Sequence, residues 1–134
     1  MKAINVSRVS TEEQKEAGNS LPAQIERINK YCERKGFEVA EKDIFSFDES
    51  AYKDKRDEFD KLLEYVQEVA KKEKIAVCFD KVDRLSRSVF DKRVGTLYEM
   101  AVADRIELHF VSDGQVINNQ MSAVEKFQFG MSLG

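Results

Sequence analysis

Residues 75–79 read IAVCF, five apolar residues in a row, and the charged segment 80–87 follows them directly. A short, continuously apolar run is typical of a strand buried on both faces, as the strands of a parallel sheet are. A helical pattern from about Arg56 precedes the run, and a second one, from about Ser88 to Ala103, follows it. A buried strand between two helices predicts an α/β fold with a central, mostly parallel sheet flanked by helices.

The same alternation of strands and helices extends to both ends of the chain. Further strands are predicted over Ala3–Val9, within Phe37–Phe47 and over Ile106–Val111. Ser20 is expected to cap a helix that carries Pro22 in its first turn and that ends at Gly36. Ser112–Asn119 is predicted to be a loop. No internal repeat or linker interrupts the pattern, so we expect one three-layer domain.

The last segment, residues 120–134, is predicted to be a helix without a capping residue at its end. We therefore expect that 1–134 is a domain of a longer protein, truncated within this C-terminal helix. Its apolar residues form two stripes, one with Met121, Val124, Phe127 and Met131 and one with Phe129 and Leu133. The extra apolar surface fits an oligomer interface or burial in the core, and the sequence leaves both open.

Composition excludes several classes of protein. The net charge of -3 argues against a free-standing, tight DNA-binding module, which normally carries a basic excess. No apolar run approaches the roughly 20 residues of a membrane span, and no signal peptide is recognisable at the N-terminus.

Cys32 and Cys78 are too few for a disulfide framework and lack metal-ligand spacing, which favours a reducing cytoplasm. His109, the single histidine, is expected in a strand core or at the surface.

Two segments at predicted strand ends could carry chemistry. Arg8-Val9-Ser10-Thr11 ends the first strand, and Asp83-Arg84-Leu85-Ser86-Arg87 follows the buried strand. Loops at the carboxyl ends of parallel strands form the active crevice of such sheets. A serine hydroxyl among arginines suits in-line attack on a phosphodiester, because guanidinium groups neutralise the phosphate oxygens. Neither a glycine-rich phosphate loop nor an acidic cluster for a divalent metal is present, so we expect no metal and no cofactor.

Each of these features also has a purely structural explanation. Ser10 could be a turn or cap residue, and Arg8 could form only a salt bridge with Asp83. The Asp83–Arg87 segment could be a charged turn that caps the following helix, and Arg56 could be a solvated helix residue.

Taken together, these residues resemble the catalytic domain of the serine recombinases, the resolvase/invertase family, over nearly the whole chain. The resemblance rests on the order and spacing of several short motifs: Arg8-Val9-Ser10-Thr11 with Gln14, Ser20-Leu21 with Gln24, Ser50 with Arg56, and Lys81-Val82-Asp83-Arg84-Leu85-Ser86-Arg87. The longer polar stretch 15–20 and the serine at position 86 are similar to the large serine recombinases of phages and mobile elements. Departures from the family pattern are Val6, the Ser50-Ala51 pair, Asp57, and the acidic residue of the mobile loop, for which Asp48 and Glu49 compete.

The resemblance implies a role for each of these residues. Ser10 would attack a DNA phosphodiester and form a 5′-phosphoserine link, and rejoining to a new partner would need no ATP. The remaining catalytic residues would be Arg8, Arg84 and Arg87, which clamp the phosphate, Asp83, which orients these arginines or shuttles protons, and Arg56, which assists from the mobile loop. Supporting residues would be Gln14, Gln24, Asp48, Ser50 and Lys81.

The resemblance also implies partners. The protein would act on DNA as a homodimer that joins into a tetramer for strand exchange, with DNA binding supplied by regions outside residues 1–134.

Other classes of protein remain possible from the sequence. A serine phosphatase or phosphodiesterase would act on small phosphate esters without DNA. A serine transposase would share this catalytic domain but tends to carry its DNA-binding part before it. A non-catalytic oligomerisation or regulatory module would keep its function when Ser10 is replaced by alanine.

Overall fold

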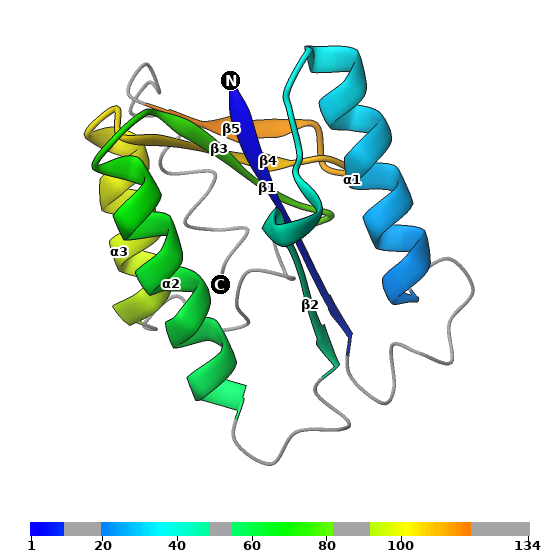
Figure 1. Cartoon of the computed structure of the whole chain (residues 1–134), viewed down its shortest axis with the longest axis horizontal. Helices are drawn as coiled ribbons and strands as arrows, with labels where there is room; N and C mark the ends of the chain where they lie inside the picture. The colour runs from blue at the N-terminus through cyan, green and yellow to red at the C-terminus, as the bar shows by residue number, and fades with distance from the viewer. Residues whose placement is uncertain (10–19, 49–54, 82–91, 119–134) are drawn as a thin grey trace.

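The apolar run at residues 75–79 lies inside the sheet, as its composition predicts. It forms strand β3 (Ile75–Phe79), whose residues are all 0 % exposed. In this computed structural model, which describes residues 1–9, 20–48, 55–81 and 92–118, β3 lies between β1 (Lys2–Val9) and β4 (Ile106–Phe110) (Figure 1). Both neighbours run parallel to β3. The continuous apolar composition therefore reflects burial from both sides.

The described residues form a five-stranded sheet in the order β2-β1-β3-β4-β5. Strand β2 (Ile44–Asp48) pairs in parallel with β1, and β5 (Gln115–Ile117) pairs antiparallel with β4. The sheet is therefore mostly parallel, and the predicted fold class is confirmed.

Helices cover both faces of the sheet (Figure 1). Helix α1 (Leu21–Lys35) packs on one face, where its buried side chains meet those of β1 and β3: Ala3, Ile28, Cys32, Ala76 and Cys78. Helices α2 (Lys55–Ala70) and α3 (Lys92–Val102) cover the other face. Their larger core cluster includes Ile4, Val6, Leu62, Val66, Phe79, Leu97 and Phe110. The two clusters lie on opposite faces of the sheet, so helix, sheet and helices form the three predicted layers.

Helix α1 has the two ends that the sequence predicts. The Ser20 hydroxyl accepts a hydrogen bond from the Ala23 amide at 3.3 Å, and Pro22 lies in the first turn. Gly36 ends the helix with φ 76°, a left-handed conformation that costs glycine little because it has no Cβ. Local capping chemistry therefore determines where α1 begins and ends.

One of the predictions for the connecting segments is confirmed and one was wrong. The strand expected within Phe37–Phe47 is present as Ile44–Asp48, which extends one residue past that range, and a 3-10 turn, Glu41–Asp43, precedes it. The loop expected over Ser112–Asn119 contains β5 instead. The chain turns back through Gly114 at φ 64°, and Ile117 is then buried in the core. Three residues are too few to show a strand periodicity, so this hairpin had no recognisable signal.

Some predicted elements lie partly or wholly outside the described residues. The helix predicted over Ser88–Ala103 is confirmed over Lys92–Val102, and its first residues lie outside. The helix predicted for residues 120–134 lies outside entirely, so its oligomeric role stays a prediction.

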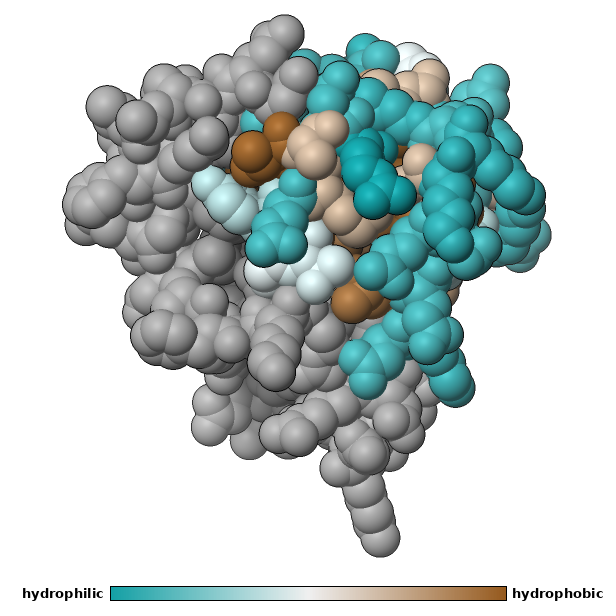
Figure 2. Space-filling model, turned by 90° about the vertical axis from the view of Figure 1, so that its left-hand side faces the viewer, coloured by the Kyte–Doolittle hydropathy of each residue, from teal (hydrophilic) through white to brown (hydrophobic). Residues whose placement is uncertain are grey.

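The described outer surface of α2 and α3 is mostly polar. Figure 2 shows the side on which α2 and α3 lie, where hydrophilic side chains cover most of the described surface and smaller apolar patches lie between them. Among the described residues, Met1 is the exposed large hydrophobic side chain. No helix of the described part is both long and apolar enough to span a membrane.

His109 is buried in β4 on the α1 side of the sheet, with 3 % of the residue exposed. Its Nδ1 lies 2.6 Å from the Tyr31 hydroxyl, and its Nε2 lies 3.0 Å from a carboxylate oxygen of Glu107. The ring also makes an edge contact with Phe37. Burial lowers the pKa of His109, and it outweighs the opposing effect of Glu107, while the charge of Lys35 adds to the lowering. The histidine is therefore a neutral core residue at pH 7.

Because the folded protein holds His109 neutral, folding stability should fall as the pH drops below the ordinary histidine pKa, about 6.5. A depressed pKa means that the unfolded chain binds the proton first, so protonation favours unfolding. We expect the thermal midpoint to fall between pH 7 and pH 5, and the variant His109→Gln to reduce that slope. Melting curves at several pH values measure it. Equal slopes for both proteins would contradict this assignment.

Candidate active site

The carboxyl ends of three neighbouring strands lie at one edge of the sheet. In the register of the sheet, Val6 of β1 lies opposite Phe79 of β3, and Val9 lies opposite Asp48 of β2. Ser10 follows β1 directly, and the segment Lys81–Arg87 follows β3 after Asp80. The two sequence segments with candidate chemistry therefore leave adjacent parallel strands at the same edge, where ligands bind in open α/β sheets.

The structure describes the side chains of three predicted site residues, Arg8, Gln24 and Lys81. It places Asp48 at the last position of β2, opposite the end of β1, and Arg56 in the first turn of α2, which begins at the same end of the molecule (Figure 1). The other predicted site residues lie outside the described residues: Ser10, Gln14, Ser50, Asp83, Arg84 and Arg87, with Glu49, the competitor of Asp48. Their roles stay predictions.

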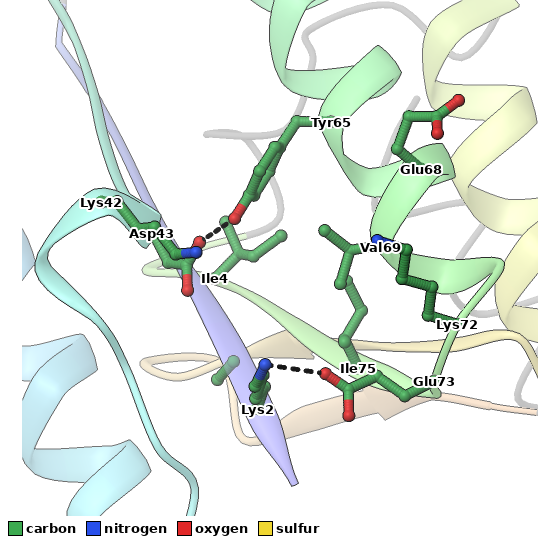
Figure 3. Close-up of a pocket in the computed structure, with 11 residues that line it drawn as sticks. Lys2, Ile4, Lys42, Asp43, Tyr65, Glu68, Val69, Lys72, Glu73 and Ile75 are labelled. Atoms are coloured by element: carbon green, nitrogen blue, oxygen red, sulfur yellow. Dashed lines mark hydrogen bonds and ion pairs between the residues drawn. The ribbon is translucent and has the colours of Figure 1, made fainter.

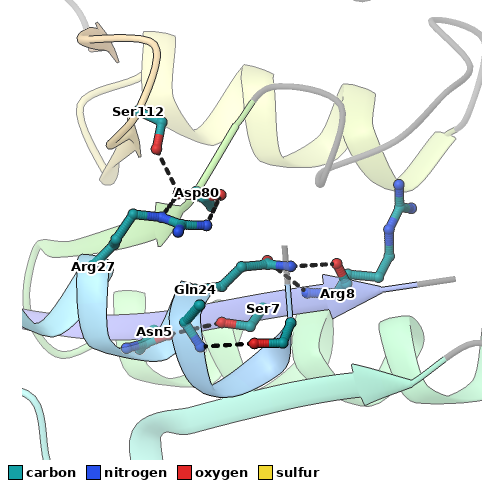
Figure 4. Close-up of polar contacts among 9 residues, drawn as sticks. Asn5, Ser7, Arg8, Gln24, Arg27, Asp80 and Ser112 are labelled. Atoms are coloured by element: carbon teal, nitrogen blue, oxygen red, sulfur yellow. Dashed lines mark hydrogen bonds and ion pairs between the residues drawn. The ribbon is translucent and has the colours of Figure 1, made fainter. Parts of the chain in front are cut away.

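Gln24 holds the end of β1 against α1. Its side-chain Nε2 donates to the Arg8 carbonyl at 3.0 Å, and its Oε1 accepts from the Arg8 amide at 3.2 Å (Figure 4). The Gln24 side chain is 0 % exposed, so these bonds are shielded from water. A glutamine that satisfies both main-chain groups of one residue fixes that residue's position along the helix. The structure therefore brings Gln24 and Arg8 together, one residue from the end of β1.

The side chain of Arg8 belongs to the other face of the sheet. Successive residues of a strand point to opposite faces of the sheet. Ile4 and Val6 alternate in step with Arg8, so they share its face, and they pack in the core under α2 and α3. Asn5 and Ser7 alternate with them on the α1 face. The Arg8 residue is partly buried at this edge. Gln24 therefore supports Arg8 through the backbone and leaves its guanidinium on the opposite face.

Buried polar side chains that sequence reasoning missed line the α1 face of β1. Asn5 and Ser7 are both 0 % exposed. The Asn5 Nδ2 donates to the Ile25 carbonyl at 3.2 Å and to the Asn29 Oδ1 at 2.8 Å, and the Ser7 hydroxyl donates to the Asn5 Oδ1 at 3.4 Å. These bonds join the middle of β1 to α1, so the strand that leads to Ser10 is held along its length.

A second buried group that sequence reasoning missed is Asp80, the residue that directly follows β3. Its carboxylate is 0 % exposed and accepts two hydrogen bonds from Arg27 of α1 (Figure 4). Burial alone would raise the pKa of Asp80, but hydrogen bonds from Arg27 and Ser112 and the charges of Arg27 and Lys81 hold it below its ordinary value. Lys81, the next residue, is exposed at the same edge. Asp80 is therefore an ionised group inside the protein.

A cavity of about 300 Å³ lies at the opposite end of the strands (Figure 3). Lys2 and Ile75, the first residues of β1 and β3, line it together with residues of α2. Four of its polar residues form two pairs: Lys2 lies 3.2 Å from Glu73, and the Tyr65 hydroxyl donates to Asp43, which raises the pKa of Tyr65 to about 12. Arg8, Gln24 and Lys81, the predicted site residues whose side chains the structure describes, do not line this cavity, which lies at the opposite end of the strands from the candidate active site.

The described residues contain no group of three or more histidine, cysteine, aspartate or glutamate side chains that could hold a metal ion. What the described edge offers is an arginine, a lysine and a set of main-chain groups held by α1.

Comparison with known protein families identifies the family of this chain. The family model of the resolvase N-terminal domain matches residues 3–132. The chain belongs to this family. The comparison with curated proteins gives no match. The resolvase domain is the catalytic domain of serine site-specific recombinases, a family that acts on DNA and as oligomers, and the match spans both segments at the edge of the sheet.

Proposed function

We propose that this resolvase domain cuts and rejoins DNA through Ser10. The observation that carries the proposal is the adjacency of β1 and β3, which run in parallel and end at one edge in a chain of the resolvase family. Ser10 follows the first strand, and the segment Asp83–Arg87 follows the second. A nucleophile and its cationic surroundings can therefore come from two neighbouring strand ends.

In the first step, the Ser10 Oγ attacks the phosphorus of a DNA phosphodiester. The serine proton is lost, the bond from phosphorus to the 3′ oxygen breaks, and that oxygen leaves as a 3′ hydroxyl after it takes up a proton. The phosphate stays on Ser10 as an ester that carries the 5′ end of the DNA. In the second step, a 3′ hydroxyl from another strand attacks this ester and releases Ser10. One ester is exchanged for another, so no ATP is consumed.

The arginines would supply the electrostatic part of catalysis. Arg8, Arg84 and Arg87 would bind the non-bridging oxygens, where negative charge accumulates in the transition state. A serine hydroxyl titrates far above neutral pH, and a cationic field favours its deprotonation. Asp83 would orient the arginines or carry protons, and Arg56 would assist from α2. The supporting positions are Gln14, Gln24, Asp48, Ser50 and Lys81.

We further propose that the protein is a large serine recombinase of a phage or mobile element, acting as a dimer that joins into a tetramer for strand exchange. The long polar stretch 15–20 and Ser86 support this subtype. Tight DNA binding would come from a region outside residues 1–134, since the domain carries a net charge of -3. The two free buried thiols, Cys32 and Cys78, support a reducing cytoplasm.

The test is a search for the covalent intermediate. The full-length protein is incubated with DNA that spans the ends of the element that encodes it, and the reaction is then denatured. We expect protein-bound DNA in which the protein is attached to the 5′ end and the 3′ hydroxyl is free, which end-labelling distinguishes. DNA that is bound but intact would contradict the proposal, and turnover of small phosphate esters without DNA would favour a phosphodiesterase.

A further inference from the structure

The ion pair between Arg27 and Asp80 joins α1 to the end of β3. The Arg27 Nε lies 3.0 Å from the Asp80 Oδ1, and its Nη2 lies 2.8 Å from Oδ2, so the guanidinium holds both carboxylate oxygens. The two residues are 53 positions apart in the sequence. A bidentate pair of this kind fixes orientation as well as distance, because two parallel hydrogen bonds require the planar guanidinium and the planar carboxylate to face each other.

The carboxylate of Asp80 is fixed from a third direction as well. The Ser112 hydroxyl donates to the Asp80 Oδ1 at 2.6 Å, and the Ser112 amide donates to the Asp80 carbonyl at 2.7 Å (Figure 4). The Val111 amide donates to the Phe79 carbonyl at 2.9 Å. The main chain at the end of β3 is therefore held by the segment that follows β4, while its side chain is held by α1.

Arg27 lies three residues after Gln24, so the two side chains project from the same face of α1. Gln24 binds the main chain of Arg8, two residues before Ser10, and Arg27 binds Asp80, three residues before Asp83. One face of one helix thus holds the carboxyl ends of both strands that lead into the candidate active site. Two neighbouring side chains of one helix therefore bind residues at the ends of two strands that are already paired in the sheet.

The burial of the Asp80 carboxylate makes this ion pair a weak source of net stability. Asp80 is 0 % exposed, whereas the Arg27 side chain is 36 % exposed. Burying a carboxylate carries a desolvation cost, and pairing it often gains little over apolar side chains of similar size. What a bidentate pair with a buried carboxylate does provide is a defined geometry. This defined geometry lies at the end of β3, three residues before the segment Asp83–Arg87.

We propose that Arg27 and Asp80 are positioning residues for DNA cleavage. By holding the end of β3 against α1, the pair sets where the segment from Lys81 onward begins relative to Ser10. This inference rests on the proposed function. It assigns to Arg27 and Asp80 no contact with DNA, so they affect the reaction through the position of the strand end.

The test compares variants of the full-length protein in the adduct assay, with the rate measured over a range of DNA concentrations. Asp80→Asn keeps the shape of the side chain and removes its charge, and Arg27→Lys keeps a cation that cannot bind both oxygens. We expect Asp80→Asn and Arg27→Ala to lower the rate at saturating DNA by about tenfold, with the half-saturating DNA concentration unchanged within about twofold. Arg27→Lys should recover part of the loss.

A double-mutant cycle tests whether the two residues act together. The double variant Arg27→Ala/Asp80→Asn should lose no more rate than either single variant, because the first substitution already breaks the pair. Lys30→Ala is the matched control, since Lys30 lies on the same helix and forms an exposed ion pair with Glu26. It should leave the rate unchanged. Circular dichroism and melting curves verify that every variant is folded at the assay temperature.

The possible failures are distinguishable. An adduct in the natural protein together with unchanged rates in folded Asp80→Asn and Arg27→Lys would overturn this inference and leave the proposed function intact. A change in the half-saturating DNA concentration alone would overturn it too, because it would place the pair in DNA binding. The absence of any adduct in the natural protein would overturn the proposed function and this inference with it.

Discussion

Replacement of Ser10 by alanine is expected to abolish the covalent protein–DNA adduct. The substitution removes the only atom that can form the phosphate ester in the proposed mechanism. Loss of a serine nucleophile lowers the rate of a protease on the order of 10⁶-fold, so no adduct should be detectable on a denaturing gel. Binding of DNA should persist, because the nucleophile contributes little to the affinity that phosphate contacts provide.

Ser46→Ala is the matched control for this prediction. Ser46 lies in β2 and is exposed, and it belongs to no predicted site. It should form the adduct at the rate of the natural protein. An adduct that persists in Ser10→Ala would assign the nucleophile to another residue. A protein whose biological function survives Ser10→Ala intact would instead favour the non-catalytic oligomerisation or regulatory module.

The elements of this fold that could be predicted from sequence are those whose signal is local. The run IAVCF identified a buried strand, and Ser20 and Gly36 marked the two ends of α1. In each case a few consecutive residues determine the outcome, through burial on both faces or through a cap. From such elements the α/β class and the shared edge of β1 and β3 followed without knowledge of any distance between them.

The parts that could not be predicted depend on contacts between distant residues. Strand β5 has three residues, and its pairing with β4 rather than its own composition makes it a strand. In the sequence, Asp80 is the first charged residue after an apolar run, a position typical of a solvent-exposed turn residue. Only packing shows that it is buried and that its partner lies in α1.

In the candidate site, too, local sequence signals could be predicted and contacts between distant residues could not. Sequence spacing singled out Arg8 and Gln24, the second through its resemblance to a family motif. It did not indicate that the Gln24 amide binds the main chain of Arg8 rather than a substrate. The pattern predicted Gln24 as a supporting residue of the site, and that role stays a prediction. Its contact with the main chain of Arg8 depends on how the strand packs against the helix, which the pattern does not contain.

Replacement of Arg8 by alanine is expected to lower the rate of adduct formation by about 10²–10³-fold, the typical cost of removing one donor that stabilises transition-state charge. The proposed role of Arg8 is to bind phosphate oxygens as negative charge accumulates on them. Alanine removes that guanidinium and keeps the amide and carbonyl that Gln24 binds. The end of β1 should therefore stay in place, and the loss should appear in the rate at saturating DNA.

Arg8→Lys separates charge from geometry. Lysine keeps the positive charge but cannot bind two phosphate oxygens in a planar fork, so its rate should lie between those of alanine and arginine. Arg105→Ala removes an exposed arginine distant in sequence from both segments, and it should have no effect on the rate. Single-turnover adduct formation at saturating DNA measures all three variants. If Arg8→Ala retained the natural rate, or if only its DNA affinity changed, Arg8 would have no part in transition-state stabilisation, and the phosphate would be held by other residues.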